Sequence, residues 1–279
     1  MQIAPSTYYA ARDREPSARQ QRDEELKPVL YDLWVKNRKV YGAIKLSKAA
    51  TNANIDIGRD QTARLMREMG IRGVARKRSK ITTTVSDDRK RPADLVDRNF
   101  VASKPDELWV TDLTYVPTRE RMAYACFILD VYARYIVGWT VAANMKTEMV
   151  LNALEMASNT RGVNLQGLKC HSDAGSQFTS LRWTERLDEI GAKPSIGSIA
   201  DSYDNAMAES LNALYKTELI YHPDQNGWDT IADVELATLS YVHWWNQQRL
   251  HGAINHLTPN RKETMYNQTK PKTLAQTMT

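Results

Sequence analysis

The sequence predicts an α/β protein in which a mixed five-stranded sheet with helices follows a small all-α domain. Two observations lead to this prediction. Residues 1–71 carry apolar side chains at helical spacing, whereas from Leu108 onwards short runs rich in β-branched and aromatic residues alternate with helical patterns. The length of 279 residues, of which 42% are hydrophobic and 25% charged, is enough for one large or two ordinary folded domains.

Three helices are expected in the first region, residues 1–71. A stripe of Leu and Val predicts the first over 19–37, a shorter pattern begins the second at Tyr41, and the third spans 59–70 with Gly70 as its stop signal. The last two lie on either side of a short polar turn. This arrangement fits a helix-turn-helix.

Polar side chains at the start of the third expected helix are suited to reading DNA. Arg59, Gln61 and Arg64 lie where the recognition helix of such a motif meets base edges, and Arg and Gln carry suitable hydrogen-bond donors. Many helical hairpins with basic faces never touch DNA. DNA contact by these three residues is therefore a hypothesis.

A basic segment, residues 72–104, is expected to be a linker or arm. Its charges are concentrated in a stretch poor in apolar residues that includes Arg76, Lys77, Arg78 and Lys80. Because neutralising phosphates releases counterions, contact with a DNA backbone is the natural use of this stretch. A plain solvated linker is the alternative.

Charge is unevenly distributed along the chain. The formal net charge is +5, but residues 1–91 hold 21 Lys and Arg against 11 Asp and Glu, so the remainder is mildly acidic. A basic front part indicates a polyanionic partner, with a merely soluble charged surface as the alternative.

Composition argues against several other classes. No apolar run approaches the ~18 residues that a membrane helix needs, and the N-terminus has no apolar segment typical of a secretory signal. Cys126 and Cys170 lie in apolar, strand-like runs and are expected to be buried thiols, as is usual in a reducing cytoplasm. The five histidines are scattered, which argues against a structural zinc site.

The second region, residues 105–225, is expected to form a sheet-and-helix core. Its first three predicted elements are strands at 108–116, 123–130 and 135–141. They are followed by a helix at 147–159, a strand at 168–173, a helix at 180–190, a strand at 193–197 and a helix that begins at 206. Short connections between the first three strands suit an antiparallel meander, and the later alternation gives a mixed sheet. A long helix at 231–250 and a weakly structured tail after Pro259 are expected within residues 226–279.

Three carboxylates stand out by position. Asp112 lies inside the first strand, Asp173 at the end of the fourth, and Glu209 on a helix whose polar face it shares with Asn212 and Lys216. An Asp in an apolar strand is costly unless it is paired or binds a cation, whereas a lone helix Glu is usually just solvated. Oxygen ligands without a Cys or His cluster favour Mg²⁺ or Mn²⁺ over zinc. Two such ions ~3.5–4 Å apart can clamp a phosphoryl transfer.

The segments around these carboxylates resemble a known family. WVTDLTY at 109–115, HSDAGSQF at 171–178 and GSIADSYDNAMAES at 197–210 are similar to the catalytic motifs of the DDE transposases of the insertion sequence 3 family, relatives of retroviral integrases. Thirty-five residues separate the second Asp from the Glu, the spacing that names the D,D-35-E group. WNQQRLH at 245–251 resembles the family's closing motif, so the resemblance covers almost the whole chain.

The resemblance implies a ribonuclease-H-like, integrase-type catalytic core with Asp112, Asp173 and Glu209 as its catalytic and metal-binding triad. It implies Mg²⁺-dependent cleavage of DNA strands at insertion-sequence ends, with two ions per site and Mn²⁺ as a substitute. The freed 3′-hydroxyl would then attack another phosphodiester, which is strand transfer.

The resemblance also implies DNA contacts near the triad. Lys216 matches the family's basic residue and is expected close to the cleavage point, while Tyr203 and Asn205 lie in the polar loop expected to approach DNA. Two positions depart from the family pattern: Ala174 stands where Arg is frequent, and Trp245 where Tyr or Phe is common. These departures affect only details of DNA contact.

The implied partners are double-stranded DNA, at insertion-sequence ends and at the target, and an upstream first-frame product (OrfA), because the chain resembles the second-frame portion (OrfB) of such elements. Bringing two ends together requires at least a homodimer on DNA. A bacterial, nucleoid-associated cytoplasmic location is expected, with no membrane partner.

Two other functions are compatible with parts of the pattern. One is a structure-selective nuclease that cuts but joins nothing, and the other is a DNA-binding regulator that does not cut. Three converging carboxylates argue against the regulator. Among other acids, Asp130 is expected to pair structurally with Arg134, and Asp201 and Asp204 to shape their loop.

Overall fold

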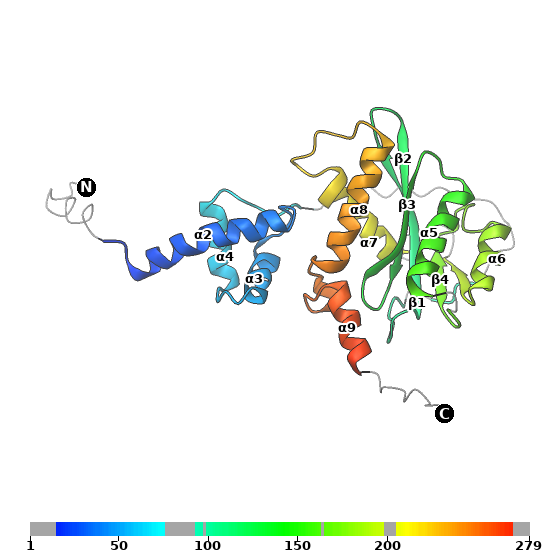
Figure 1. Cartoon of the computed structure of the whole chain (residues 1–279), viewed down its shortest axis with the longest axis horizontal. Coiled ribbons are helices and arrows are strands. Elements are labelled where there is room, and N and C mark those ends of the chain that lie inside the picture. Colours follow the sequence, from blue (N-terminus) through cyan, green and yellow to red (C-terminus); the bar gives the residue numbers. More distant parts are fainter. Residues whose placement is uncertain (1–14, 76–92, 97–98, 163–164, 198–204, 270–279) are drawn as a thin grey trace, which may run out of the picture. The chain divides into compact units, whose positions relative to one another are not determined.

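The structure is a computed structural model that describes residues 15–75, 93–96, 99–162, 165–197 and 205–269 (Figure 1). The chain divides into two compact units, Met1–Val74 and Ala75–Thr279, and each is described here by itself.

The described part of the first unit contains three helices, α2 (Ala18–Lys36), α3 (Ala43–Asn52) and α4 (Arg59–Glu68). A capping box begins α2, and Gly70, with a φ of 68°, takes the left-handed conformation that follows the end of α4. Fully buried leucines from all three helices form the core of the unit: Leu30, Leu46 and Leu65. The expected all-α domain is present.

Five strands of the second unit form one sheet in the order β3-β2-β1-β4-β5. They are β1 (Leu108–Pro117), β2 (Met122–Asp130), β3 (Tyr135–Ala142), β4 (Lys169–Ser172) and β5 (Lys193–Ile196). The first three strands pair antiparallel, whereas β4 is parallel to both β1 and β5. This is the mixed, ribonuclease-H-like sheet that the resemblance implies, so the predicted fold class is confirmed.

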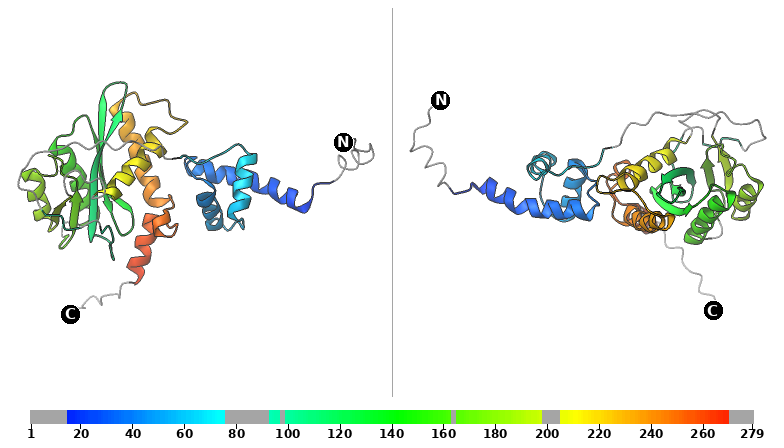
Figure 2. Two further views of the ribbon diagram at one scale, coloured as in Figure 1. Left: turned by 180° about the vertical axis from the view of Figure 1, so that it is seen from behind. Right: turned by 90° about the horizontal axis from the view of Figure 1, so that it is seen from above.

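Helices cover both faces of this sheet. α5 (Thr147–Arg161) and α6 (Leu181–Glu189) lie on one face, and α7 (Ala206–Tyr215) and α8 (Ile231–Gln247) on the other. The view from behind in Figure 2 shows the same separation. The main apolar core, which contains the fully buried Trp109, lies between the strands and the α5–α6 layer. Successive side chains of a strand point to opposite faces of the sheet, and Asp112 comes three residues after Trp109 in β1. Asp112 therefore lies on the opposite face, which α7 covers.

After α7 the chain continues into η1 (Lys216–Ile220), a π-helical turn. Near the C-terminus the sequence predicts a weakly structured tail, which is wrong for the part that forms α9 (Pro259–Thr269). Glu263 is only 8% exposed and pairs with Arg161 of α5, which ties this helix to the core. A local pattern cannot reveal a contact between residues so far apart in the chain. Residues 270–279 lie outside the described part.

Both cysteines agree with the sequence prediction. Cys126 and Cys170 are free and buried, and burial raises the pKa of each thiol to about 12. Of the helices in the described ranges, none combines the length and the apolar character needed to cross a membrane.

Candidate active site

Asp112 in β1 and Asp173, the residue directly after β4, lie at matching distances beyond the last paired residues of two neighbouring strands. β1 and β4 are parallel, and the last pair in register is Val110 with His171. Each aspartate comes two residues later in its own chain segment, and paired strands are about 4.8 Å apart. The sheet therefore brings the two carboxylates together where β4 ends.

Asp112 is half-buried, and its carboxylate accepts hydrogen bonds from two neutral donors. The backbone N–H of Leu113 donates to Oδ1 (2.8 Å), and Asn212 of α7 donates from Nδ2 to Oδ2 (2.9 Å). Burial raises the pKa of Asp112 to about 8, and the negative charges of Asp173 and Glu209 contribute to this increase. The carboxylates thus repel one another, and the two neutral donors offset this only in part.

Asp173 begins the connection between β4 and α6. The backbone N–H of Gly175 donates to Asp173 Oδ1 (3.1 Å), and a Cβ at position 175 would lie 3.0 Å from the same oxygen. Although the residue as a whole is exposed, the protein around its carboxyl group raises its pKa through desolvation. A glycine at 175 therefore lets the backbone hold this carboxylate at close range.

Glu209 lies on the exposed side of the first turn of α7, and two asparagines tie this helix to β1. Asn205 donates from Nδ2 to the carbonyl oxygen of Thr111 (3.1 Å), and Asn212 makes the bond to Asp112. Because the asparagines come four residues before and three residues after Glu209, they fix the part of α7 that carries this acid.

Asn212 is a site residue that sequence reasoning missed. The helical spacing places it on the polar face with Glu209 and Lys216, but in the structure it is only 7% exposed and faces the sheet. Its Oδ1 atom is buried and has no hydrogen-bond partner among the described residues. The spacing of three from Glu209 is the signal that could have found it, but this spacing alone does not say which side of the helix faces β1.

Lys216 is the first residue of η1 and is half-buried. Burial lowers the pKa of its ammonium group, and the negative charge of Asp112 opposes this change. Lys216 therefore lies within electrostatic reach of Asp112.

The carboxylates suit a divalent cation by their chemistry. Asp112, Asp173 and Glu209 are oxygen donors. Burial raises the pKa of both aspartates, and the charge of Asp173 adds to the shift at Asp112, so a bound cation would stabilise their charged forms. Within the described ranges, no three His, Cys, Asp or Glu side chains are gathered closely enough to hold one ion. Cation binding would therefore require these side chains to converge further.

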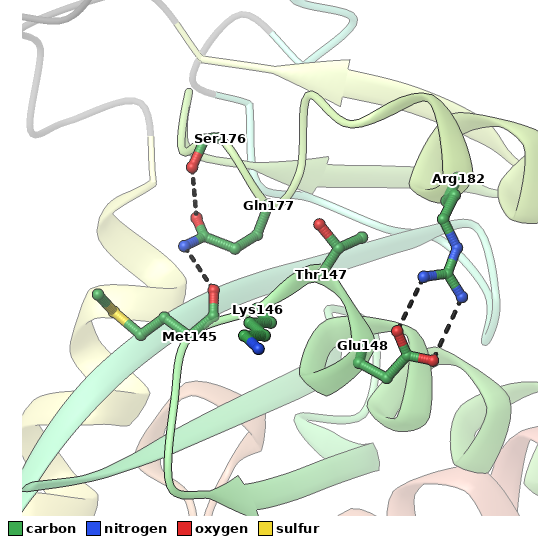
Figure 3. A pocket seen from close by; sticks show the side chains of 7 residues that line it. All are labelled: Met145, Lys146, Thr147, Glu148, Ser176, Gln177 and Arg182. Atoms are coloured by element: carbon green, nitrogen blue, oxygen red, sulfur yellow. Dashed lines mark hydrogen bonds and ion pairs between the residues drawn. The ribbon is translucent and has the colours of Figure 1, made fainter.

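A pocket of about 390 Å³ opens beside the connection that Asp173 begins (Figure 3). Seven residues line it: Met145, Lys146, Thr147, Glu148, Ser176, Gln177 and Arg182. Gln177 joins the two loops of the pocket by donating to the carbonyl oxygen of Met145 (2.8 Å), and Arg182 pairs with Glu148 (2.8 Å). The remaining cation, Lys146, is exposed, so the pocket presents a positive charge and hydroxyl groups beside the loop that follows Asp173.

In the first unit, two of the three residues expected to contact DNA bond a buried acid instead. Arg64 Nη2 lies 2.8 Å from both carboxylate oxygens of Asp23, and Gln61 donates to the same carboxylate (2.9 Å). Asp23 is only 5% exposed, so these bonds hold α4 against α2. Arg59 is 67% exposed and is paired with Asp60 at 3.3 Å. Of the two arginines, Arg59 therefore presents its guanidinium group more openly to solvent than Arg64, whose side chain is 28% exposed.

Of the remaining residues expected to contact DNA, the structure describes only Asn205. Asn205 is 6% exposed and bonded to β1, so its side chain does not reach outwards as expected. Outside the described residues lie Tyr203, Arg76, Lys77, Arg78 and Lys80, together with the two loop acids Asp201 and Asp204.

The side chains of Asp130 and Trp245 both form hydrogen bonds with backbone groups of the second unit. The Asp130 carboxylate is fully buried and accepts backbone N–H bonds from Asp106 (2.7 Å) and Ala133 (3.0 Å), while burial raises its pKa to about 6. Trp245, which departs from the family pattern, donates its indole N–H to the carbonyl oxygen of Arg134 (2.8 Å). A Phe at this position could not make that bond.

Comparison with known protein families covers most of the chain. Residues 21–79 match the family described as HTH-like domain. Two families described as Integrase core domain match residues 102–202 and residues 190–259.

Named relatives extend this similarity along almost the full length. The putative transposase for insertion sequence element IS986/IS6110 of Mycobacterium tuberculosis is 46% identical over 270 residues, which is 95% of this chain and 96% of the relative. The transposase for insertion sequence element IS629 of Shigella sonnei is 45% identical over 271 residues, 95% of this chain and 90% of the relative. Among solved structures, the HTLV-2 integrase catalytic core domain in complex with magnesium has a TM-score of 0.42 and 15% identity, over 58% of this chain and 98% of that chain. With a helix-turn-helix-like unit, an integrase core and relatives of this identity and coverage, the chain belongs to the insertion sequence 3 family of DNA transposases.

Proposed function

We propose that Asp112, Asp173 and Glu209 are the catalytic residues with which this transposase cuts the ends of its insertion sequence and joins them to target DNA. The observation that carries the proposal is that Asp112 in β1 and Asp173, directly after β4, each come two residues after the last paired residues of these parallel strands, Val110 and His171. Burial raises the pKa of both groups, and the charge of Asp173 adds to the shift at Asp112. Two neighbouring carboxylates whose negative charges are met by neutral N–H donors favour a bound cation and are typical of a functional site.

Each residue of the site has a proposed role. Asp112, Asp173 and Glu209 would hold Mg²⁺, two ions per site, with Mn²⁺ as a substitute. When bound, such ions supply Lewis acidity for the attack of water or a 3′-hydroxyl on a phosphodiester. Asn212 keeps the Asp112 carboxylate oriented through its 2.9 Å bond. Lys216 neutralises a DNA phosphate near the cleavage point.

The pocket beside Asp173 offers a place for a neighbouring DNA phosphate. Lys146 supplies a positive charge there, and Thr147 and Ser176 supply hydroxyl donors. Loss of Lys146 should therefore weaken DNA binding about equally for all sequences, because a phosphate contact carries no base information.

The helix-turn-helix-like unit and the basic segment at 72–104 are proposed to bind DNA outside the active site, with Arg59 as the exposed contact of α4. Neutralising Arg76, Lys77 and Arg78 should reduce the slope of log affinity against log salt by about 2 to 3, because each lost phosphate contact removes about 0.9. An unchanged slope would mean that the segment is only a linker.

The assembly proposed around this chain follows from the reaction. Two element ends must be brought together, so at least a homodimer binds double-stranded DNA, and an upstream OrfA product or fusion completes end recognition. We place this assembly on the nucleoid in a bacterial cytoplasm. The functional regions proposed are 1–71 and 72–104 for DNA binding, 105–225 for catalysis, and 226–279 as the C-terminal long helix and tail.

The test compares cleavage and binding in matched variants of the full chain. Asp112→Asn and Glu209→Gln should keep DNA affinity but lower Mg²⁺-dependent nicking of a duplex carrying the flanking inverted repeats by about 10³-fold or more. Glu235→Gln, which removes an exposed acid of α8, is the control and should nick at the wild-type rate. Undiminished nicking by Asp112→Asn or Glu209→Gln would overturn the site assignment.

A second assay separates a transposase from a nuclease that only cuts. A pre-nicked end with a free 3′-hydroxyl should be joined to plasmid DNA when the upstream product is supplied. Nicking without joining under these conditions would favour the nuclease.

A further inference from the structure

The π-helical turn η1 joins the candidate active site to the C-terminal part of the unit. Helices of this kind are rare, occur as single turns, and are frequent at functional sites. η1 begins with Lys216, which lies within electrostatic reach of Asp112, and it carries Glu218 two residues later. A contact that fixes Glu218 therefore also constrains the backbone at Lys216, two residues earlier in the same turn.

Glu218 is held by three hydrogen bonds in the interior. Arg249 Nε donates to Oε2 (2.8 Å), Arg249 Nη2 donates to Oε1 (2.5 Å), and the hydroxyl of Tyr241 donates to Oε2 (3.1 Å). Glu218 is 5% exposed and Arg249 is 2% exposed. The paired donors of a guanidinium group fix the plane of a carboxylate as well as its position.

Arg249 is itself held by Trp245 and His251, and Asn246, the residue after Trp245, is bonded to the sheet. Its guanidinium group lies 4.5 Å from the ring centroid of Trp245, and its Nη1 atom lies 3.2 Å from Nδ1 of His251. Trp245 in turn donates to the carbonyl oxygen of Arg134, and Asn246 makes two 2.9 Å hydrogen bonds with the backbone of Ile136 in β3. The motif at 245–251 thus connects η1 to the sheet.

Stability alone does not require a charged pair at this place. Well-packed apolar residues of similar volume are often as stabilising as a buried ion pair, because two charges lose their hydration on burial. What the pair supplies, and an apolar contact does not, is a fixed direction for the side chain of Glu218.

We propose that Glu218 and Arg249 are positioning residues of the active site, and that their buried pair holds η1 so that Lys216 keeps its place four residues after Asn212, whose side chain bonds Asp112. The inference rests on the proposed function, since it takes Lys216 as a group that acts on DNA at the site. Neither Glu218 nor Arg249 needs to touch DNA. Both act through the turn that carries Lys216.

The test is a cycle of variants in the full chain, assayed by single-turnover nicking of the inverted-repeat duplex with Mg²⁺ and by thermal unfolding. Glu218→Leu with Arg249→Met removes both charges together, so the protein should stay folded. The nicking rate at saturating DNA should fall about 10-fold to 100-fold, as expected when a group near the reaction is misplaced by about 1 Å. Lys216→Ala should show a similar loss. Adding the pair substitutions to Lys216→Ala should cost less than a further twofold, because residues that act through one group are non-additive.

A second buried pair in the same unit is the control. Arg161 and Glu263 join α5 to α9 through two hydrogen bonds and have no link to η1 among the described residues. Arg161→Met with Glu263→Leu should leave the nicking rate unchanged, whatever it does to thermal stability. If Glu218→Leu with Arg249→Met does not fold, the same measurements are made with Arg249→Lys in place of the pair substitutions. Arg249→Lys keeps the buried positive charge and removes only the two parallel N–H donors of the guanidinium group.

Three results would overturn the inference. They are a wild-type nicking rate in the folded pair variant, a wild-type rate in Lys216→Ala, and multiplicative losses when the substitutions are combined. Asp112→Asn in the same assay tells the two claims apart. If Asp112→Asn also nicks normally, the proposed function has failed, whereas if it is inactive only the positioning role is lost.

Discussion

Asp23 and Asp112 are two aspartates in similar settings with opposite electrostatic outcomes. Each is at least half-buried, and each receives a side-chain amide from a facing helix, Gln61 for Asp23 and Asn212 for Asp112. Asp23 has in addition the guanidinium group of Arg64 across both oxygens. Hydrogen bonds from Gln61 and Arg64 lower the pKa of Asp23, whereas burial and Asp173 raise the pKa of Asp112 to about 8.

The comparison separates a structural acid from a candidate ligand. An aspartate whose charge is met by a bonded Arg needs no further partner, and its network closes within the protein. An aspartate that faces another carboxylate and is bonded only by neutral amides has an uncompensated negative charge, which a cation from solution can neutralise. The sequence does not show the partners that separate them, because Arg64 meets Asp23 and Asn212 meets Asp112 across distant parts of the chain.

Removing the amide beside Asp112 should slow the reaction more than any change beside Asp23. Asn212→Leu leaves the carboxylate without its orienting bond, so nicking should fall about 10-fold to 100-fold while DNA affinity stays unchanged. The measurement is single-turnover cleavage beside a filter-binding titration. Asn152→Leu, at an exposed position of α5, serves as the control. Normal cleavage by Asn212→Leu would show that the bond does not matter for the site.

Removing the cation beside Asp23 should affect stability rather than chemistry. Arg64→Met leaves a buried acid without its charged partner, so the melting temperature of the first unit should fall by about 5 °C or more. Calorimetry measures this, with Arg67→Met on the exposed side of the same helix as the control. If both variants melt alike, the Arg64 bond adds nothing to the stability of the unit.

The pH dependence of stability should differ in sign between the two acids. Between about pH 4 and about pH 8, folded Asp112 keeps a proton that the unfolded chain releases, so its contribution to the free energy of unfolding declines as pH rises. Without divalent cations, Asp112→Asn should therefore melt about 2 to 5 °C above the wild type at pH 8 and level with it at pH 4. Asp23, whose pKa is lowered, contributes stability above its unfolded pKa and loses it in acid, so Asp23→Asn should melt below the wild type at neutral pH. The same sign for both variants at pH 8 would contradict the comparison.

Much of the fold was predictable because its signals are local. Apolar strand runs, helical periods and the Gly70 stop each lie within one segment, and the spacing of Asp173 and Glu209 points to a family whose fold is known. The sequence did not predict the partners of polar residues on helix faces. Asn212 bonds Asp112, which lies 100 residues away in the sequence, and Glu218 bonds Arg249, which lies 31 residues away.

The errors have the same cause. Asn205 was expected to reach DNA from a polar loop, but its amide bonds the backbone of β1. The segment that forms α9 looks weak in isolation, yet Arg161 anchors it through Glu263. In both cases a contact between residues distant in the chain decides the outcome, and no local pattern records it.

Cation binding at Asp112 is the most direct test of the account. Titration calorimetry of Mn²⁺ into the wild type at pH 7, in buffers of different ionisation enthalpy, should show binding with release of a proton, because Asp112 with its raised pKa is mostly protonated before the ion binds. Asp112→Asn should bind Mn²⁺ more than about tenfold more weakly, as expected from the loss of one charged ligand, and should release fewer protons than the wild type. Equal affinity and equal proton release in the two proteins would contradict the assignment of Asp112 to the metal site.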